Sequence, residues 1–515
     1  MTTHRPSTLW VHVTTLLNWS RPPVGIVRVE REYVRWLLDR LPGEPVRFCL
    51  FDRPSGRFVE VPLDTVREKL GLPAAMALPV TATALAAEPA ASDKAAEASV
   101  GLDSPEGAAA EGPSEPGVEQ APAAPARQLP LWKRLIKQTL LTAVGVLPAA
   151  WRPVLIARLR FVQHVLIHAP RALREALEYK GARQVLEPGA VDPATQRPRS
   201  PFARGDRFIS LGLDWDTLDQ QVLYGLKRDL DLKLTLICYD VIPVLFPHLV
   251  VLPPGSFAAY FTDMAWCADS ILCISEHTQR DCQSLLRKFG VPQPATHVIR
   301  LGSQVPAQGE GVQPPTLPMD RPFVLFVSTI ERRKNHEILY RAWVRLREQG
   351  LTPYRLVFVG MQGWGVSDLY HDLHLDPRVK DDISILHHLS DEELAWMYRH
   401  CAFTVFPSLY EGWGLPVVES LACGKFCLAS NASSLPEAGG DFAEYLDPWD
   451  LSAWVERLKF FMEHPQEVQA RNARIAREFM PPQWHDTAAR IHQLAWSDDV
   501  TSDQRQPLAL TPESA

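Results

Sequence analysis

From Arg207 onward, short apolar runs alternate with helical patterns, and this alternation constrains the fold more than any other feature of the chain. The runs RFISLGL, LKLTLICYD, SILCIS and THVIRLG are typical of buried strands. Between them, FAAYFTDMAWCA and HTQRDCQSLLRKF have the apolar spacing of helices. Because strands that alternate with helices form parallel sheets, the pattern predicts an α/β domain with helices covering its sheet.

A second series of the same kind begins with PFVLFVST at 322–329. It continues through strands YRLVFVG, ISILHHL, FTVFPS and FCLAS, with helices at 335–348, 391–401, 416–423 and 450–463. The stretch GSQVPAQGEGVQPPTLPMDR before it is rich in Gly and Pro and is typical of a linker. Two doubly wound halves are therefore predicted, with a ligand crevice between them at the carboxyl ends of the strands.

Residues 8–70 are also predicted to fold. LWVHVTTL indicates a strand, and GIVRVEREYVRWLLDRL indicates an amphipathic helix. In that helix Ile26, Val29, Tyr33 and Leu37 recur at spacings of three or four.

The next segment changes composition twice. Residues 81–128 are rich in Ala, Pro, Glu and Gly, contain no aromatic residue and carry eight acidic but two basic residues. Such a stretch buries too little apolar surface to offset its ordering entropy, which predicts a disordered insertion. Residues 131–183 hold ten Lys and Arg against two Glu, with apolar residues at helical spacing. These basic helices either lie on an anionic membrane surface or pack on the neighbouring domain with their charges solvated.

The composition excludes several classes of protein. The 515 residues carry a net charge of −7, which excludes a globally basic nucleic-acid coat, and we expect no nucleic-acid partner. Eight Cys without any CxxC spacing fit neither a disulfide scaffold nor a zinc site, and favour a reducing, cytoplasmic compartment. The first residues lack the apolar core of a signal peptide, and no stretch of 18 apolar residues predicts a transmembrane helix.

The strongest motif is PSLYEGWGLPVVESLACGK at 407–425. Pro416 suits the first position of a helix and Gly424 suits its end. The residues before that helix therefore lie where free N–H groups favour anions or sugar hydroxyls; they are Gly412, Trp413, Gly414 and Leu415. Glu411 on the loop and Glu419 on the helix can face one crevice and reach different parts of an extended ligand.

This string resembles the family-four retaining glycosyltransferases of GT-B fold, which carry a Glu-x7-Glu motif. The resemblance implies two Rossmann-like domains facing a central cleft. It also implies that Glu411 approaches the donor sugar as a catalytic residue and that Glu419 holds the ribose hydroxyls of the nucleotide.

Further segments resemble the same family. STIERRKNHEIL at 328–339 matches a segment that neutralises the donor diphosphate, which implies catalytic Lys334 and donor-binding Arg333. Many relatives carry a second diphosphate-binding Arg before that Lys, whereas this chain has Ser328 and Thr329. The stretch LHHLSDEELAWMYRHC implies that His388 and Leu389 lie beside the base, largely through backbone contacts.

The N-terminal half matches more loosely. PPVGIVRVEREY implies that Gly25 approaches the donor phosphate or the acceptor. LICYDVIPVLFPHL matches a segment usually written His-Asp, and here the pair is Tyr239-Asp240. The resemblance implies that Asp240 orients an acceptor hydroxyl, and the alternative is a helix-capping role.

The resemblance implies no metal and no cofactor, because the nucleotide sugar is itself a substrate. Asp214-Trp215-Asp216 has the Asp-x-Asp form of a GT-A metal site, but two carboxylates alone are a poor cage for a divalent ion. We interpret Asp216 as a helix-start cap instead.

These observations predict eight segments. They are the first part of the N-terminal domain (1–80), the insertion (81–130), the basic helices (131–183), the rest of the acceptor-side domain (184–305), the linker (306–320), the nucleotide-sugar domain (321–480), a helix returning to the N-terminal domain (481–497) and a disordered tail (498–515).

The predicted function is transfer of a hexosyl unit from a UDP- or GDP-linked sugar to a glycan or lipid-linked acceptor, in bacterial surface polysaccharide synthesis. Two alternatives stay open: a nucleotide-sugar epimerase of the same fold, and a non-catalytic nucleotide-sugar-binding scaffold. The basic helices make peripheral contact with the inner face of the cytoplasmic membrane a further prediction.

Overall fold

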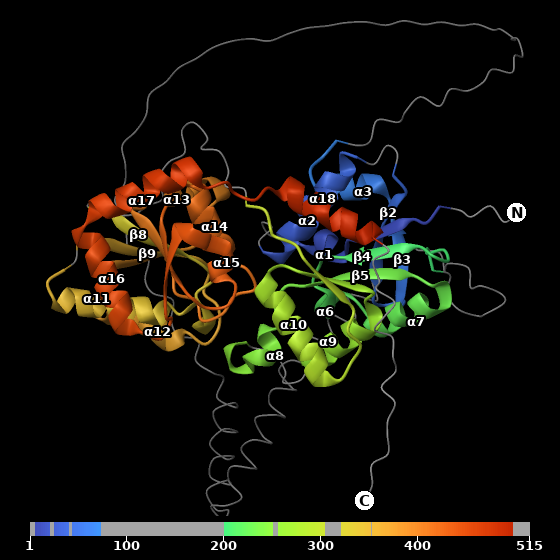
Figure 1. Cartoon of the computed structure of the whole chain (residues 1–515), viewed down its shortest axis with the longest axis horizontal. Coiled ribbons are helices and arrows are strands. Elements are labelled where there is room, and N and C mark those ends of the chain that lie inside the picture. The colour runs from blue at the N-terminus through green and yellow to red at the C-terminus, as the bar shows by residue number, and fades with distance from the viewer. Residues whose placement is uncertain are drawn as a thin grey trace, which may run out of the picture. The chain divides into compact units, whose positions relative to one another are not determined.

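The computed structural model describes seven stretches of the chain, drawn in colour in Figure 1: residues 6–20, 25–40, 44–73, 200–250, 256–303, 321–351 and 353–497. All of them belong to one compact unit formed by residues 1–77 and 198–515. Four predicted segments lie outside the described residues: the insertion 81–130, the basic helices 131–183, the linker 306–320 and the tail 498–515.

The N-terminal half is built on a seven-stranded sheet in the order β3-β2-β1-β4-β5-β6-β7. All neighbouring strands are parallel except β2 and β3, which form an antiparallel pair. The strands are β1 (Leu9–His12), β2 (Val46–Asp52), β3 (Arg57–Val61), β4 (Arg207–Ser210), β5 (Lys233–Cys238), β6 (Ser270–Cys273) and β7 (Ala295–Val298).

Alternate side chains of these strands pack on opposite faces, as the two-residue period of a strand requires. Leu9 and Val11 join a buried cluster with helix α2, whereas Trp10 joins a second cluster with helix α9. The helices are α1 (Thr14–Asn18), α2 (Ile26–Leu38), α3 (Leu63–Lys69), α6 (Asp214–Thr217), α7 (Gln220–Leu230), α8 (Ile242–Leu245), α9 (Ser256–Cys267) and α10 (Glu276–Phe289), with a 3₁₀ turn η1 (Pro247–Leu249).

The C-terminal half has a six-stranded, fully parallel sheet in the order β10-β9-β8-β11-β12-β13. The order reverses between β8 and β11, so a crevice is expected beyond the carboxyl ends of those two strands. The strands are β8 (Phe323–Val327), β9 (Arg355–Val359), β10 (Ile383–Leu386), β11 (Phe403–Phe406), β12 (Cys427–Ser430) and β13 (Ala443–Leu446).

Both faces of this second sheet are buried as well. Val324 and Phe326 pack in the larger cluster with α11 and α16, while Phe323 and Leu325 pack against α13. The helices are α11 (His336–Glu348), α12 (Ser367–Leu375), α13 (Asp391–His400), α14 (Leu415–Ala422), α15 (Leu435–Gly439), α16 (Leu451–Glu463), α17 (Pro465–Glu478) and α18 (Trp484–Trp496), with 3₁₀ turns η2 (Arg332–Lys334) and η3 (Gly440–Phe442).

The last helix, α18, packs on the first long helix, α2, although more than 400 residues separate them (Figure 1). Trp484 and Ile491 of α18 lie in the same buried cluster as Tyr33 of α2. The Oγ1 of Thr487 also donates a hydrogen bond of 2.7 Å to the carbonyl of Arg300. This helix therefore completes the core of the N-terminal half.

The predicted α/β class with two Rossmann-like doubly wound domains is confirmed by the two sheets. One prediction was wrong in detail: the strand LWVHVTTL ends at His12, and Thr14 already begins helix α1. The hairpin β2–β3 was not predicted. None of the helices in the described ranges combines the length and hydropathy that crossing a bilayer requires.

Candidate active site

The motif at 407–425 forms the turn from β11 into helix α14. Pro416 lies in the first turn of α14, where its missing N–H costs no hydrogen bond. Gly414 precedes the helix with φ +146°, and a Cβ built on it would lie 2.8 Å from Cδ2 of Leu435. Glycine is therefore required there by both conformation and space.

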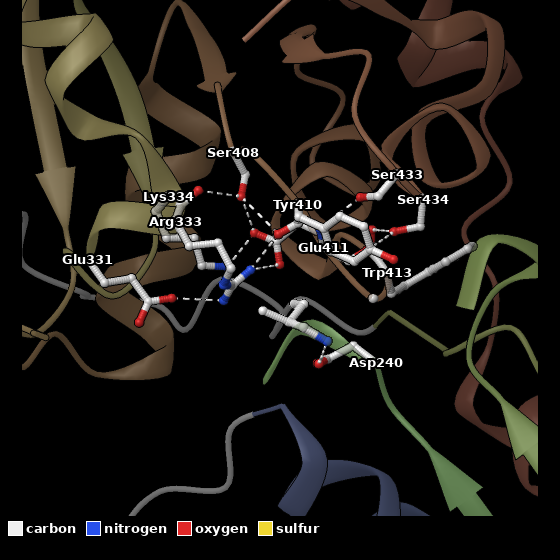
Figure 2. Close-up of polar contacts among 12 residues, drawn as sticks. Asp240, Glu331, Arg333, Lys334, Ser408, Tyr410, Glu411, Trp413, Ser433 and Ser434 are labelled. Atoms are coloured by element: carbon white, nitrogen blue, oxygen red, sulfur yellow. Dashed lines mark hydrogen bonds and ion pairs between the residues drawn. The ribbon is translucent and has the colours of Figure 1, made fainter. Parts of the chain in front are cut away.

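Glu411 on this turn lies within a cluster of charged groups (Figure 2). Its Oε1 is 2.6 Å from Nζ of Lys334, and its Oε2 is 2.8 Å from Nη1 of Arg333. The Oγ of Ser408 donates a further hydrogen bond of 2.6 Å to Oε1. The two cations come from η2, after β8, and the glutamate follows β11. They therefore meet where the strand order of the C-terminal sheet reverses.

This environment keeps Glu411 ionised. Burial raises the pKa of its carboxyl, but Arg333 and Lys334 outweigh that effect and lower the pKa to about 2. Burial and the neighbouring Arg333 lower the pKa of Lys334, although Glu411 acts in the opposite direction. At neutral pH the Glu411 carboxylate can accept hydrogen bonds from sugar hydroxyls but cannot act as an acid.

Arg333 connects this pair to further acceptors. Its guanidinium donates to the carbonyl of Tyr410 at 2.7 Å and to Oε1 of Glu331 at 2.8 Å. Burial lowers its pKa, but Glu411 and Glu331 reverse that effect and raise it overall. Arg333 and Lys334 of η2 are therefore both paired with carboxylates of the protein itself.

Asp240, at the end of β5, contributes a third carboxylate beside Arg333 (Figure 2). Burial raises its pKa, while Arg333 and the backbone N–H of Ile242 lower it. The Oδ1 of Asp240 accepts a hydrogen bond of 3.0 Å from that N–H, at the start of α8. Asp240 therefore binds the first N–H of α8 from the residue before the N-cap Val241, and its acceptor-orienting role stays a prediction.

Tyr239, which stands where relatives carry His, is directed into the N-terminal core. Its hydroxyl donates a hydrogen bond of 2.6 Å to the carbonyl of Leu211. Its side chain is 6% exposed. The residue thus packs below the site rather than projecting toward Glu411.

Gly412 brings the motif against the end of β5. A Cβ on Gly412 would lie 2.1 Å from the carbonyl oxygen of Tyr239 and 3.2 Å from Cβ of Asp240. The Oγ1 of Thr278 donates a hydrogen bond of 3.1 Å to the Gly412 carbonyl. Only a residue without a side chain permits this approach.

Glu419 has different partners from Glu411. The Tyr398 hydroxyl donates a hydrogen bond of 3.1 Å to its Oε2, and Nη1 of Arg28 lies 3.7 Å from its Oε1. Burial raises its pKa, while Arg28 and Tyr398 oppose that effect. The two glutamates of the motif therefore occupy separate environments.

A cavity of about 330 Å³ adjoins Asp240. Its walls are mostly aromatic and aliphatic, with Asp240 as the one carboxylate among the described lining residues. They include Ile26, Trp215, Pro243, Phe257, Tyr260 and Trp364. Such a pocket, apolar with a single polar anchor, is the usual form of a small-molecule site.

The family description "Glycosyl transferases group 1" matches residues 310–479, the part that contains Lys334, Glu411 and Glu419. Residues 310–479 are a group 1 glycosyltransferase domain. The predicted resemblance to group 1 glycosyltransferases is therefore confirmed for these residues.

Two Escherichia coli proteins are similar to this chain. O-antigen chain mannosyltransferase B is 30% identical over 184 residues, which cover 35% of this chain and 44% of that protein. Serotype-specific mannosyltransferase WbdA is 28% identical over 252 residues, which cover 46% of this chain and 31% of the relative. The chain thus spans less than half the length of either relative.

Among solved structures, Anabaena HepE in complex with UDP-glucose has a TM-score of 0.43 with this chain. The two are 15% identical, and the match covers 56% of this chain and 77% of HepE.

Five other predicted site residues lie in different places, four of them within residues 310–479. Gly25 precedes α2 with φ +50° and open space around it. His388 has φ +58° and is exposed, and Leu389 packs beside the α13 cluster. Trp413 is 5% exposed and packs into the N-terminal core cluster, with Leu415 at its edge.

Sequence reasoning missed three groups that organise the group 1 site. Glu331 pairs with Arg333, and Arg28 pairs with Glu419. Ser433 accepts a hydrogen bond of 2.7 Å from the N–H of Glu411. Glu331 is two residues before Arg333, so an acid directly before the basic run was an available signal. No such signal was available for Arg28 or Ser433, because their partners Glu419 and Glu411 are remote in sequence.

The Asp-x-Asp stretch lies in the short helix α6. Asp214 is buried and accepts a hydrogen bond of 2.5 Å from Ser210. The interpretation of Asp216 as a helix cap was wrong, because Leu213 is the N-cap and Asp216 lies inside α6. No group of three or more metal-ligating side chains occurs within the ranges that the structure describes.

Proposed function

We propose that this chain transfers a hexosyl unit from a nucleotide sugar to a hydroxyl of a glycan or lipid-linked glycan, with retention at the anomeric carbon and without a metal ion. The observation that carries the proposal is the meeting of Lys334, Arg333 and Glu411 at the switch point of the group 1 domain. The mannosyltransferase names of the two Escherichia coli relatives support mannose as the first sugar to test.

The proposed roles follow from charge and position. Lys334 and Arg333 stabilise the negative charge that develops on the departing diphosphate. The ionised Glu411 holds hydroxyls of the donor sugar, and Glu419 with Arg28 and Tyr398 holds the nucleotide ribose. Gly25, Gly412, Gly414 and the backbone at His388 and Leu389 let the chain approach the donor closely.

Asp240 orients the attacking hydroxyl of the acceptor. The acceptor itself occupies the cavity beside Asp240. This cavity favours transfer over epimerisation, because an epimerase acts on one nucleotide sugar and needs no second substrate. The intact cation–carboxylate cluster likewise favours an enzyme over a scaffold.

A panel of UDP- and GDP-linked hexoses tests the donor, because a ligand that binds the native state raises its thermal unfolding temperature. Transfer from the stabilising donor to glycan fractions is then followed by product analysis, with the anomeric configuration read by NMR. An epimerised free nucleotide sugar would overturn the proposal in favour of the alternative. Unchanged turnover in Lys334→Ala would overturn the site assignment.

We also propose peripheral contact with the cytoplasmic membrane through the basic residues 131–183, a segment outside the described residues. Flotation with anionic liposomes compares the whole chain with a 131–183 deletion. Equal flotation of the two proteins would end this part of the proposal.

A further inference from the structure

A second, smaller cavity lies between helices α7 and α9 of the N-terminal half. It has a volume of about 190 Å³ and shares no lining residue with the cavity beside Asp240. We call it the α7–α9 groove. Its lining residues are Gln220, Gln221 and Tyr224 from α7 and Asp263, Trp266 and Cys267 from α9.

The walls of the α7–α9 groove are held in place by contacts between the two helices. The Nζ of Lys227 donates a hydrogen bond of 2.7 Å to the carbonyl of Cys267, at the end of α9. The Sγ of Cys267 donates to the carbonyl of Gln220 at 3.0 Å. Asp219 caps the start of α7 by accepting from the N–H groups of Gln221 and Val222. The groove is therefore preformed, which lowers the entropy cost of binding.

The amide of Gln220 lies in the wall of the groove. Its side chain is 6% exposed, and neither its amide nitrogen nor its amide oxygen has a hydrogen-bond partner or is open to solvent. The polar side chains that a ligand in the groove can reach are therefore Gln221, which is exposed, and Asp263, which is partly exposed.

Two aromatic rings line the groove and remain open to solvent. Trp266 is 52% exposed and Tyr224 is 39% exposed. Asp263 adds a carboxylate on the same helix as Trp266. Flat apolar rings beside planar polar groups suit a sugar ring, whose C–H face stacks on an aromatic ring while its hydroxyls make hydrogen bonds.

A hydroxylated ligand fits the groove better than a cation. A cation could pair with Asp263 and stack on Trp266, but it cannot accept a hydrogen bond from the amide NH₂ of Gln221. A hydroxyl group both donates and accepts, so it can bond either atom of that amide as well as the carboxylate. The Gln221 amide and the Asp263 carboxylate together match neighbouring hydroxyls of one pyranose.

We propose that the α7–α9 groove is a second carbohydrate-binding site, which holds a saccharide unit of a glycan away from the reacting end. This second site rests on the proposed function, because the glycan that it holds is the acceptor or the product of the transfer. Helix α9 connects the two sites, because Phe257 lines the cavity beside Asp240 and Trp266 lines the groove. Nine residues of helix separate them, about 14 Å, a span that a short oligosaccharide can bridge.

Retention of the whole chain in gels containing neutral polysaccharides tests this site. The probes are an α-mannan, a galactan and a glucan, each compared with a gel without polysaccharide. We expect at least one to retain the wild-type protein, and both Trp266→Ala and Asp263→Asn to weaken retention at least fivefold. Trp266→Phe should restore part of it, because an aromatic face remains. Trp449→Ala is the matched control, since Trp449 is 75% exposed but lies in the group 1 domain.

The proposal is overturned if Trp266→Ala migrates like the wild type in every gel, including the case in which no polysaccharide retains either protein. Thermal unfolding of each variant confirms that it is folded. Lys334→Ala separates the two proposals, because it should lose stabilisation by the nucleotide sugar yet keep polysaccharide retention. If it keeps both, the proposed function fails while the second site stands.

Discussion

The Nζ of Lys334 and Oε1 of Glu411 lie 2.6 Å apart, although 77 residues separate them in sequence. Glu411 is buried and the Lys334 side chain is 13% exposed, and Arg333 binds the second oxygen of the same carboxylate at 2.8 Å. In the absence of a donor, the carboxylate therefore neutralises the two cations proposed to bind the diphosphate. Replacing Glu411 and replacing Lys334 should therefore change the affinity for a diphosphate in opposite directions.

Glu411→Gln should bind a nucleoside diphosphate more tightly than the wild type but turn over more slowly. The substitution keeps the shape of the side chain and removes the charge that competes for Lys334 and Arg333. We expect a roughly five- to tenfold gain in affinity, or about 1 kcal/mol, and a roughly 10²-fold loss of kcat. Titration calorimetry and steady-state kinetics measure the two quantities; wild-type values for both would contradict the assignment of Glu411.

Lys334→Ala should lower both diphosphate affinity and kcat. The lost cation stabilises charge on the leaving group, and removal of one such donor costs roughly 10²–10³ in rate. Glu411 keeps Arg333 and Ser408 as partners, so the protein should remain folded. Lys380→Ala, at an exposed position of the same domain, serves as the control and should behave like the wild type.

The Glu411 carboxylate should stabilise the native state above pH 4.5 and lose that effect in acid. Its pKa falls from the ordinary 4.5 to about 2, against the effect of burial, because Arg333 and Lys334 favour the charged form. The unfolded chain therefore takes up the proton first as pH falls from about 4.5 towards 2. At most about 3 kcal/mol of unfolding free energy is lost in this window. Urea unfolding at several pH values should show a steeper acid decline for the wild type than for Glu411→Gln, and parallel curves would contradict the shift.

Gly412→Ala should displace the catalytic turn. The added Cβ would lie 2.1 Å from the Tyr239 carbonyl, a backbone atom that cannot move aside cheaply. We expect a destabilisation of roughly 1–3 kcal/mol and loss of most activity. Gly225→Ala is the matched control, because Gly225 lies in α7 with open space around it. Alanine there should be neutral or stabilising by up to about 1 kcal/mol. Equal unfolding temperatures for the two variants would show that Gly412 does not lie this close to the Tyr239 carbonyl.

Tyr239→Phe should reduce stability and leave donor binding unchanged. The variant removes the hydroxyl that donates to the Leu211 carbonyl at 2.6 Å, which costs roughly 1 kcal/mol. Since the ring lies in the core, the KM for the donor should stay within twofold of the wild type. A tenfold rise in that KM would instead indicate that Tyr239 acts where relatives use His.

Much of the fold could be predicted from local patterns. The apolar runs ending at Val327 and Phe406 marked β8 and β11, and Pro416 with Gly424 marked the two ends of α14. These features depend on residues close in sequence, whose spacing determines whether a segment is buried on one face or two. The hairpin β2–β3 escaped prediction although its strands have seven and five residues, more than the four of β1.

The candidate site could be predicted only in part. The motif identified Glu411 and Glu419, but it indicated one shared crevice, whereas the two carboxylates have separate partners. Trp413 is likewise next to Glu411 in the motif, yet its ring is buried in the core of the other half. Neighbours on one turn point in different directions, and sequence spacing alone does not give those directions.

The sequence by itself determined the two α/β halves, their element order and the residue types of the site, because periodicity and turn chemistry are local properties. The tertiary structure alone decided that Lys334 and Arg333 are paired with Glu411, that Tyr239 is directed inward, and that two cavities flank helix α9. The reason is that strand order, rather than distance along the chain, brings the ends of β8 and β11 together. Partners 77 residues apart leave no trace in local sequence.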